Sequence, residues 1–312
     1  MTIKTVSSMV AAAVLGIGCG SPQPTAPHPG HESASDAIRA WIQQLPAAYE
    51  KGDATIFDHR IDPDGLFIST APEEVWDAPT FIDLHHEMLG KVAAGQIRWK
   101  VAIKDLLIGE APDGKSAWMT MEVDWRFGDR PETVPSRWSG VMIERDGRWA
   151  LSASEVSFAV PDAEAFQLAA AGKLVASKPI ADKIDPGAEE LLAVFDRDLA
   201  APINLVTDLS DRPEVSMLGT APADHMVDGA AIKKVMQAHL ADMHETLKRA
   251  GVRAHLAPGG QLGWLMTTVE DTVEPKPGTH VVLPLRTLAV YVREGGAWKL
   301  VHWHSSNAVP NG

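Results

Sequence analysis

Cysteine, tyrosine and long apolar runs are scarce in this chain of 312 residues. It has one cysteine, Cys19, and two tyrosines. A single cysteine cannot form a disulfide within the chain, and no cysteine-based site is apparent. The sequence also lacks a glycine-rich phosphate loop and a nucleophile-elbow motif, so it gives no signature of phosphate cradling or of serine-hydrolase chemistry.

Basic residues are fewer than acidic ones, with 28 Lys and Arg against 41 Asp and Glu, which gives a formal net charge of −13. The acidic residues are spread along the chain. A nucleic-acid partner would need a basic stripe, so none is expected. The charge instead favours a soluble, self-repelling surface. Hydrophobic residues make up 45% of the chain, which excludes general disorder, and the length allows two domains of ordinary size.

The first apolar run ends at the only cysteine. Residues 1–18 contain one cation, Lys4, followed by small and apolar residues. This run is short for a membrane span and is typical of an export signal. Leu15-Gly16-Ile17-Gly18-Cys19 resembles a bacterial lipobox, in which the cysteine is lipidated and becomes the new N-terminus. The alternative is an ordinary signal peptide with an incidental cysteine.

Residues 19–34 are rich in proline, glycine and serine, and their composition predicts a flexible tether. No second hydrophobic span follows. We therefore expect an exported lipoprotein that faces the periplasm or the cell exterior, with the lipid anchor as its only membrane contact.

The chain repeats itself with a spacing close to 150 residues. Residues 137–161 align without a gap on residues 286–310, and the loop Ser69-Thr70-Ala71-Pro72 recurs as Gly219-Thr220-Ala221-Pro222. This spacing predicts two tandem domains, 35–161 and 187–312, joined by a helix and linker over 162–186. The matched pairs are Arg137/Arg286, Gly147/Gly296, Trp118/Trp264, Trp149/Trp298 and Pro161/Pro310.

Each half has helical periodicity first and period-two alternation afterwards. In the first half the helices are expected over 35–52, capped by Ser35, and over 79–94, after Asp77. Strands are expected over 99–108, 117–126, 137–145 and 148–158, and the second half is expected to have a helix over 229–250. The prediction is an α+β fold of two cone-shaped barrels, each with helices on a curved antiparallel sheet.

The closing segment of the second half carries a family resemblance. Its motif consists of Gly296, Trp298, Lys299, Leu300, Val301, His302, His304 and Ser306. Helices followed by a long meander that ends in this motif resemble the SnoaL-like branch of the nuclear transport factor 2-like superfamily. The resemblance implies a cone with a pocket at its wide end and pairing of domains through their sheets. It does not decide between cyclases, isomerases or dehydratases and binding or structural modules.

His302 and His304 are the first candidates for chemistry, because residues two apart on a strand share a face. They would serve as acid–base groups or metal ligands if that face lines the cone, and as strand-capping groups if it does not. A pair of His304 with Glu270 is the catalytic hypothesis, and it would place the chemistry in the second half. Ala153 and Glu155 occupy the histidine positions in the first half.

Acidic and aromatic residues form the second set of candidates. A buried carboxylate can act as a base next to a carbonyl, and tryptophans can wall an apolar pocket, although packing in the core is the alternative for both types. We predict a small apolar or amphipathic ligand or an envelope partner, with no cofactor and no metal. An enzyme and a structural envelope protein are the alternatives. The predicted ligand-binding residues are Trp76, Trp99, Trp125, Trp138, Glu155 and Asp124.

Two further positions have structural interpretations. Arg137 and Arg286 recur in both halves, so a role in the fold is favoured over a functional one. His85, His86 and Glu87 are consecutive on a helix and point in different directions, which disfavours a metal site. His85 is expected at the edge of the core.

Overall fold

The first half begins with helices and ends with a four-stranded meander. The computed structural model describes residues 33–240, 245–276 and 279–308. The predicted signal segment, Cys19 and all of the predicted tether except residues 33 and 34 lie outside the described residues, and those two residues cap and begin the first helix. The elements of this half are α1 (Ala34–Ile42), α2 (Leu45–Lys51), the 3-10 helix η1 (Ala54–Phe57), β1 (Ile61–Ile68), β2 (Val75–Asp77), α3 (Ala78–Ala93), β3 (Trp99–Glu110), β4 (Ser116–Phe127), β5 (Val134–Arg145) and β6 (Arg148–Ser157).

The second half repeats this order, with α4 (Asp162–Ala170) between the two. The elements after α4 are β7 (Lys183–Ile184), α5 (Glu189–Ala200), α6 (Ile203–Asp208), β8 (Ser216–Leu218), β9 (His225–Val227), α7 (Gly229–Leu240), β10 (Glu245–Leu256), β11 (Leu262–Lys276), β12 (Thr279–Glu294) and β13 (Ala297–Asn307).

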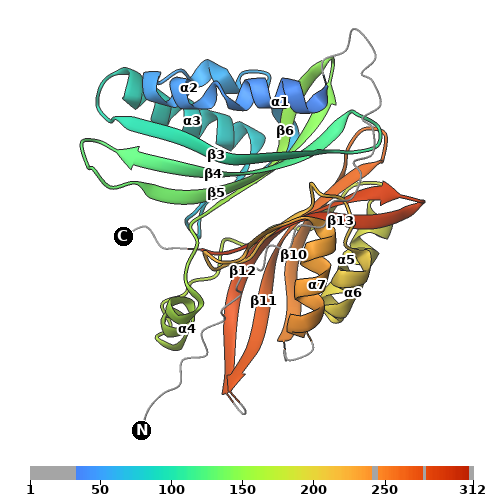
Figure 1. Ribbon diagram of the computed structural model, residues 1–312. Coiled ribbons are helices and arrows are strands. Elements are labelled where there is room, and N and C mark those ends of the chain that lie inside the picture. The colour runs from blue at the N-terminus through green and yellow to red at the C-terminus, as the bar shows by residue number, and fades with distance from the viewer. Residues whose placement is uncertain (1–32, 241–244, 277–278, 309–312) are drawn as a thin grey trace, which may run out of the picture. The chain divides into compact units, whose positions relative to one another are not determined.

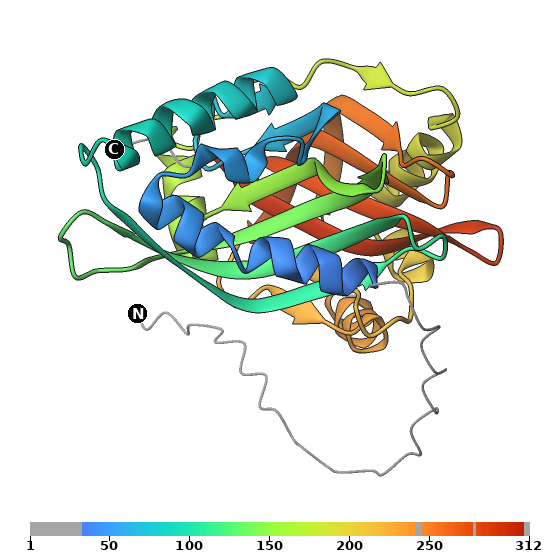
Figure 2. The same cartoon turned by 90° about the horizontal axis from the view of Figure 1, so that it is seen from above.

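The helices start where the sequence provides a cap. Ser33, rather than the expected Ser35, caps α1 by accepting a hydrogen bond from the backbone N–H of Asp36. Asp77 caps α3 by accepting from the N–H of Thr80 at 3.0 Å, and Pro79 occupies the first turn, where its missing N–H costs nothing. Figure 2 shows α1, α2 and α3 lying along one face of the first sheet.

Each half forms one curved sheet, and both sheets are mixed rather than purely antiparallel. The order in the first sheet is β2-β1-β6-β5-β4-β3, and in the second β7-β10-β11-β12-β13-β8-β9. The meander is antiparallel, as predicted, but its last strand returns beside an early strand in parallel. Phe67 pairs with Ser154 in the first half, and Met217 pairs with Trp303 in the second. The chain between these strands includes a helix, so no hairpin fixes their relative direction.

The expected helix over 229–250 is too long. Helix α7 ends at Leu240, and residues from Glu245 belong to β10, where Leu247 pairs with Asp271 of β11. The alternating contacts of β10 with β11 override the helical propensity of this lysine- and leucine-containing segment.

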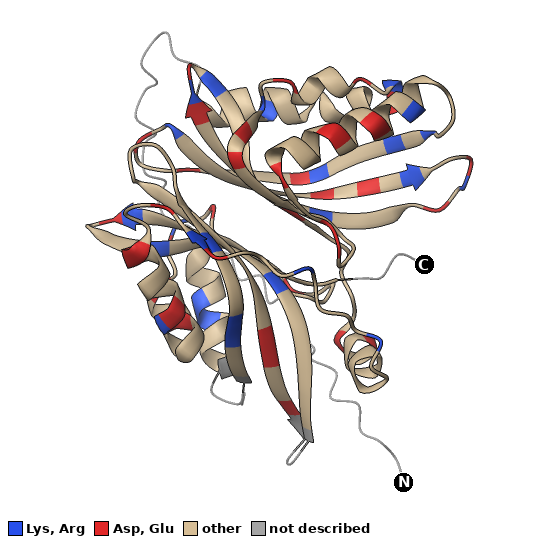
Figure 3. Ribbon diagram, turned by 180° about the vertical axis from the view of Figure 1, so that it is seen from behind, with Lys and Arg blue, Asp and Glu red and all other residues tan. Residues whose placement is uncertain are grey.

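The two sheets contact each other through the faces opposite their helices (Figure 1). One buried cluster joins Trp118 and Val141 of the first half to Leu288 and Val290 of the second. Another, which includes Trp41 and Phe57, lies between the first sheet and its own helices. Figure 3 shows acidic and basic residues interspersed on both halves. None of the described helices has the length and apolarity needed to span a bilayer.

Candidate functional site

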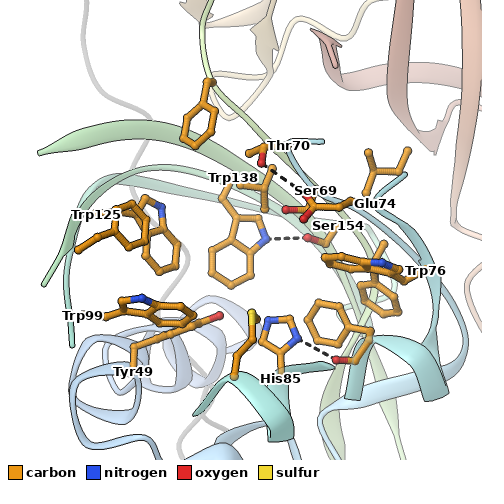
Figure 4. Close-up of a pocket in the computed structure, with 17 residues that line it drawn as sticks. Tyr49, Ser69, Thr70, Glu74, Trp76, His85, Trp99, Trp125, Trp138 and Ser154 are labelled. Carbon is orange, nitrogen blue, oxygen red and sulfur yellow. Dashed lines mark hydrogen bonds between the residues drawn. The ribbon is translucent and has the colours of Figure 1, made fainter. Parts of the chain in front are cut away.

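A cavity of about 180 Å³ lies in the first half, between its helices and its sheet (Figure 4). All four tryptophans predicted to bind a ligand line this cavity, together with four phenylalanines and Tyr49. The four tryptophans are Trp76 on β2, Trp99 on β3, Trp125 on β4 and Trp138 on β5.

Two of the four indole N–H groups are hydrogen-bonded to serine hydroxyls of the sheet. Trp138 donates from Nε1 to Ser154 Oγ at 2.8 Å, and Trp125 donates to Ser136 Oγ at 2.8 Å. An N–H that already has an acceptor in the protein does not become an unsatisfied donor when a ligand displaces water from the site. The cavity therefore presents aromatic surface at fixed orientations.

Tyr49, Trp99 and Trp125 contact one another, and two of the three pairs meet at steep angles. Tyr49 lies 5.2 Å from Trp125, centroid to centroid, with an interplanar angle of 87°. Trp99 lies 6.2 Å from Trp125 at 83°, and 5.8 Å from Tyr49 at 36°. The rings of Tyr49 and Trp99 both pack steeply against Trp125. We call Tyr49, Trp99 and Trp125 the aromatic corner.

His85 supplies a polar atom to this apolar site. Its Nδ1 lies 2.8 Å from the backbone oxygen of Phe81. A carbonyl oxygen only accepts, so Nδ1 carries the proton and Nε2 is left as an acceptor. Burial lowers the pKa of His85 to about 4, so the ring is neutral at physiological pH. Figure 4 shows the second ring nitrogen turned toward the interior of the cavity.

A short loop forms the rim, and of its two glutamates Glu74 lines the cavity. The backbone N–H of Ala71 donates to Glu74 Oε2 at 2.8 Å, and the N–H of Ser69 donates to the Glu74 backbone oxygen at 3.0 Å. Thr70 Oγ1 lies 3.4 Å from the same Oε2. Ser69, Thr70 and Glu74 line the cavity. We call residues 69–74 the rim loop.

Arg286 of the second half holds the rim loop. Its guanidinium donates to the backbone oxygens of Ser69 and Ala71, the latter at 3.2 Å, and its side chain is 1% exposed. Arg137 does the same in the opposite direction, donating to the backbone oxygens of Ala221 and Thr220 at 3.2 and 3.3 Å. The two matched arginines thus bind matched loops across the contact between the halves, which agrees with the structural role favoured from the sequence.

The predicted catalytic histidines do not line the cavity. His302 and His304 share a face of β13, as expected, but that face is turned toward the first sheet and both side chains are fully buried. His304 is hydrogen-bonded through Nδ1 to Ser139 Oγ at 2.9 Å and through Nε2 to Ser157 Oγ at 2.8 Å. Both ring nitrogens of His304 are therefore hydrogen-bonded within the protein.

The predicted pair of His304 with Glu270 is wrong. Glu270 is exposed on β11, opposite Lys248 and Pro284, whereas His304 is enclosed between the sheets. Burial lowers the pKa of His304 well below its usual value. A neutral, fully buried ring with two serine partners has no access to a substrate proton.

The two predicted acidic ligand-binding residues also lie away from the cavity. Glu155 is fully buried between the sheets, where it accepts a hydrogen bond from Ser306 Oγ at 2.7 Å. Burial raises its pKa to about 7, against the opposing effect of Arg286. Asp124 is partly exposed and forms an ion pair with Lys104. The buried location of Glu155 between the sheets agrees with the repeat, because Glu155 corresponds to His304 of the second half, which is also fully buried.

The second half carries different side chains at the positions that line the cavity of the first half. The gapless repeat places Trp303 at the position of Ser154, and Trp303 stacks on Phe195 of α5 at 5.9 Å. Met236 stands eight residues after Asp228, as His85 stands eight residues after Asp77. The structure thus corrects the expectation that the second half is better equipped for chemistry.

Sequence reasoning missed several cavity residues. Tyr49 lies beyond an unforeseen break between α1 and α2, at Gln43 and Gln44. Glu74 lies in a loop with no motif of its own. The recurrence of the rim loop in the second half was the one available signal. Within the described residues, no group of three or more His, Cys, Asp or Glu side chains is placed to hold a metal ion.

Comparison with known proteins identifies a domain family. The SnoaL-like domain family matches residues 38–161 and again residues 192–310. No curated protein matches the chain.

Solved structures resemble one half of the chain at a time. An NTF2-like protein from Cytophaga hutchinsonii is 18% identical, covers 41% of this chain and 99% of its own, and has a TM-score of 0.33. A protein with a cystatin-like fold from Caulobacter vibrioides is 19% identical, with coverages of 41% and 92% and a TM-score of 0.35. An NTF2-like protein from Pseudomonas putida is 16% identical, with coverages of 40% and 89% and a TM-score of 0.32.

Proposed function

Since the chain belongs to the SnoaL-like domain family, and carries that domain twice, we propose that its first half binds a small molecule and its second half supports the binding site. The observation that carries this proposal is the cavity, which combines tryptophan walls with a few oriented polar atoms.

The size of the cavity limits the ligand. At about 180 Å³ it is slightly larger than the roughly 150 Å³ engineered cavity that holds benzene in another protein. The ligand is therefore a compact molecule of one ring or of comparable bulk. A polyketide- or steroid-sized molecule would not fit inside.

The supporting role of the second half rests on Arg286 and Trp303. Arg286 fixes the backbone of the rim loop. Trp303 corresponds in the repeat to Ser154, which lines the cavity, and it stacks on Phe195. The second half would then act as scaffold for the binding site of the first.

Export and lipid anchoring at Cys19 complete the proposal. Support comes from the apolar run before the only cysteine and from the proline-rich segment after it. Mass spectrometry of the mature protein, purified from the membrane fraction of its own cells, is expected to find an N-terminus at Cys19 with acyl chains. A mature N-terminus without acyl groups would contradict anchoring and leave the binding proposal intact.

Ligand-observed ¹⁹F NMR with fluorobenzene tests the cavity. The signal is expected to broaden on addition of the protein, and Met88→Trp is expected to abolish the effect because Met88 lines the cavity. Met236→Trp, on the corresponding helix of the second half, is the matched control and should retain it. An unaffected signal with the unsubstituted protein, or equal broadening with Met88→Trp, would show that the cavity takes no such ligand.

A further inference from the structure

We propose that the cavity selects a small organic cation, such as an alkylammonium or quaternary ammonium compound. This inference rests on the proposed binding function and specifies the chemical class of the ligand. It is carried by the arrangement of aromatic rings, by the hydrogen-bonding state of His85 and by the charge at the rim.

The aromatic corner gathers three electron-rich rings in the wall of the cavity. The face of an aromatic ring carries partial negative charge, and cations bind within about 6 Å of the ring centroid. Tyr49, Trp99 and Trp125 have centroids within 5.2 to 6.2 Å of each other. A compact cation at this corner would contact several rings at once. Trp138 presents a further ring, because its N–H is bonded to Ser154.

The polar groups of the cavity also favour a cation or a donor. His85 presents Nε2 as a hydrogen-bond acceptor, since its Nδ1–H donates to the backbone oxygen of Phe81. Among the described residues that line the cavity, Glu74 alone carries a charge, and Figure 4 shows its carboxylate near Trp138 and Ser154. An anion would meet a carboxylate, ring faces and an acceptor, and no cationic side chain from the lining.

Arg286 is a cation beside the rim loop and opposes the charge of Glu74. It reduces the effect of Glu74, because its guanidinium lies just behind the rim loop. Its N–H groups are, however, committed to backbone oxygens and to Ser306 at 3.1 and 3.2 Å, and its side chain is buried. Arg286 therefore faces the sheet contact, while the Glu74 carboxylate faces the cavity.

A matched pair of probes separates charge from shape. Choline and 3,3-dimethylbutan-1-ol have nearly the same shape, and only choline is charged. Calorimetric titration of the full chain is expected to give a dissociation constant for choline at least tenfold below that for the alcohol. Glu74→Gln should remove most of this ratio, because the amide can still accept from Ala71 but carries no charge.

Asp224→Asn is the control variant. Asp224 accepts from the N–H of Ala221 at 3.0 Å in the matched loop of the second half, so its loss perturbs the same loop contact away from the cavity. It should leave the choline-to-alcohol ratio unchanged.

The alternative outcomes are distinct. If the alcohol binds as tightly as choline, or if only fluorobenzene binds, the cation proposal is overturned and the binding function stands. If Glu74→Gln keeps the full ratio, the rim carboxylate is not the source of selectivity and the proposal fails in this form. If no probe binds, including fluorobenzene, both proposals fail.

Discussion

His302 is a titratable side chain fully enclosed by the fold. Its Nδ1 is bonded to Ser216 Oγ at 2.8 Å, and burial lowers its pKa to about 3. Between this value and the ordinary pKa near 6.5, the unfolded chain binds a proton that the folded chain does not. The burial of a neutral His302 therefore does not lower the free energy of unfolding above pH 6.5. Below that pH, the free energy of unfolding decreases progressively until the pH reaches about 3.

We expect His302→Leu to reduce this pH dependence. From pH 6 to pH 4.5 the free energy of unfolding of the unsubstituted protein should fall by about 2 kcal/mol more than that of the variant. Urea denaturation at the two pH values measures the difference. The comparison must be between variants, because Glu155 and Asp198 have raised pKa values and act in the opposite direction.

His280→Leu serves as the control, since His280 is exposed on β12. It should follow the pH dependence of the unsubstituted protein. Equal pH dependence in His302→Leu and His280→Leu would mean that His302 takes up its proton in the folded state.

At the residue scale, the sequence predicted which side chains share a face but not where that face points. Period-two alternation placed His302 and His304 together, and the structure confirms this. A sheet covered on both sides has two buried faces, so alternation alone cannot distinguish the cavity face from the face that meets the other sheet. The four tryptophans do line the cavity, and the signal that singled them out was their absence from the second half.

The rim loop shows how an element of one half depends on the other. Arg286→Lys should lower the free energy of unfolding by about 1–3 kcal/mol, because an ammonium cannot reproduce the forked contacts to the Ser69 and Ala71 backbone. It should also weaken binding of fluorobenzene or choline severalfold, since Glu74 is held by the same loop.

Arg137→Lys is the internal reference for this prediction. It removes the equivalent contacts to Thr220 and Ala221 and should cost similar stability with little effect on binding. Chemical denaturation and calorimetric titration of the two variants provide both quantities. Equal effects on binding would show that the rim loop is not specifically controlled by Arg286.

Element boundaries were predicted best where the chain has strong local signals. Asp77 and Pro79 marked the start of α3, and the turn at Asp146 and Gly147 marked the hairpin between β5 and β6. The end of α7 had no glycine or proline to mark it before Glu245. Such boundaries are decided by pairing with distant strands, which local sequence does not contain.

At the scale of the whole molecule, the repeated tryptophans join the two halves. Trp118 donates from Nε1 to the backbone oxygen of Glu214 at 3.1 Å, and its partner in the repeat, Trp264, donates to Ser152 Oγ at 3.2 Å. Both side chains are fully buried. The repeat identified these residues as a matched pair. It did not predict that each would bond to the other half, because sequence similarity between copies carries no information about their contact.

This shared core predicts a single cooperative unfolding transition, although the chain contains two domains of the same family. Separating the halves would expose the cluster that contains Trp118 and Leu288. It would also remove the backbone oxygens of the other half to which Arg137 and Arg286 donate. Seven of the ten tryptophans lie in the first half, so tryptophan fluorescence reports mainly on that half. Hydrogen exchange of the β12 and β13 amides reports on the second. In a urea titration the two probes should give the same midpoint, whereas a first half that unfolds at lower urea than β12 and β13 would show that the halves are independent.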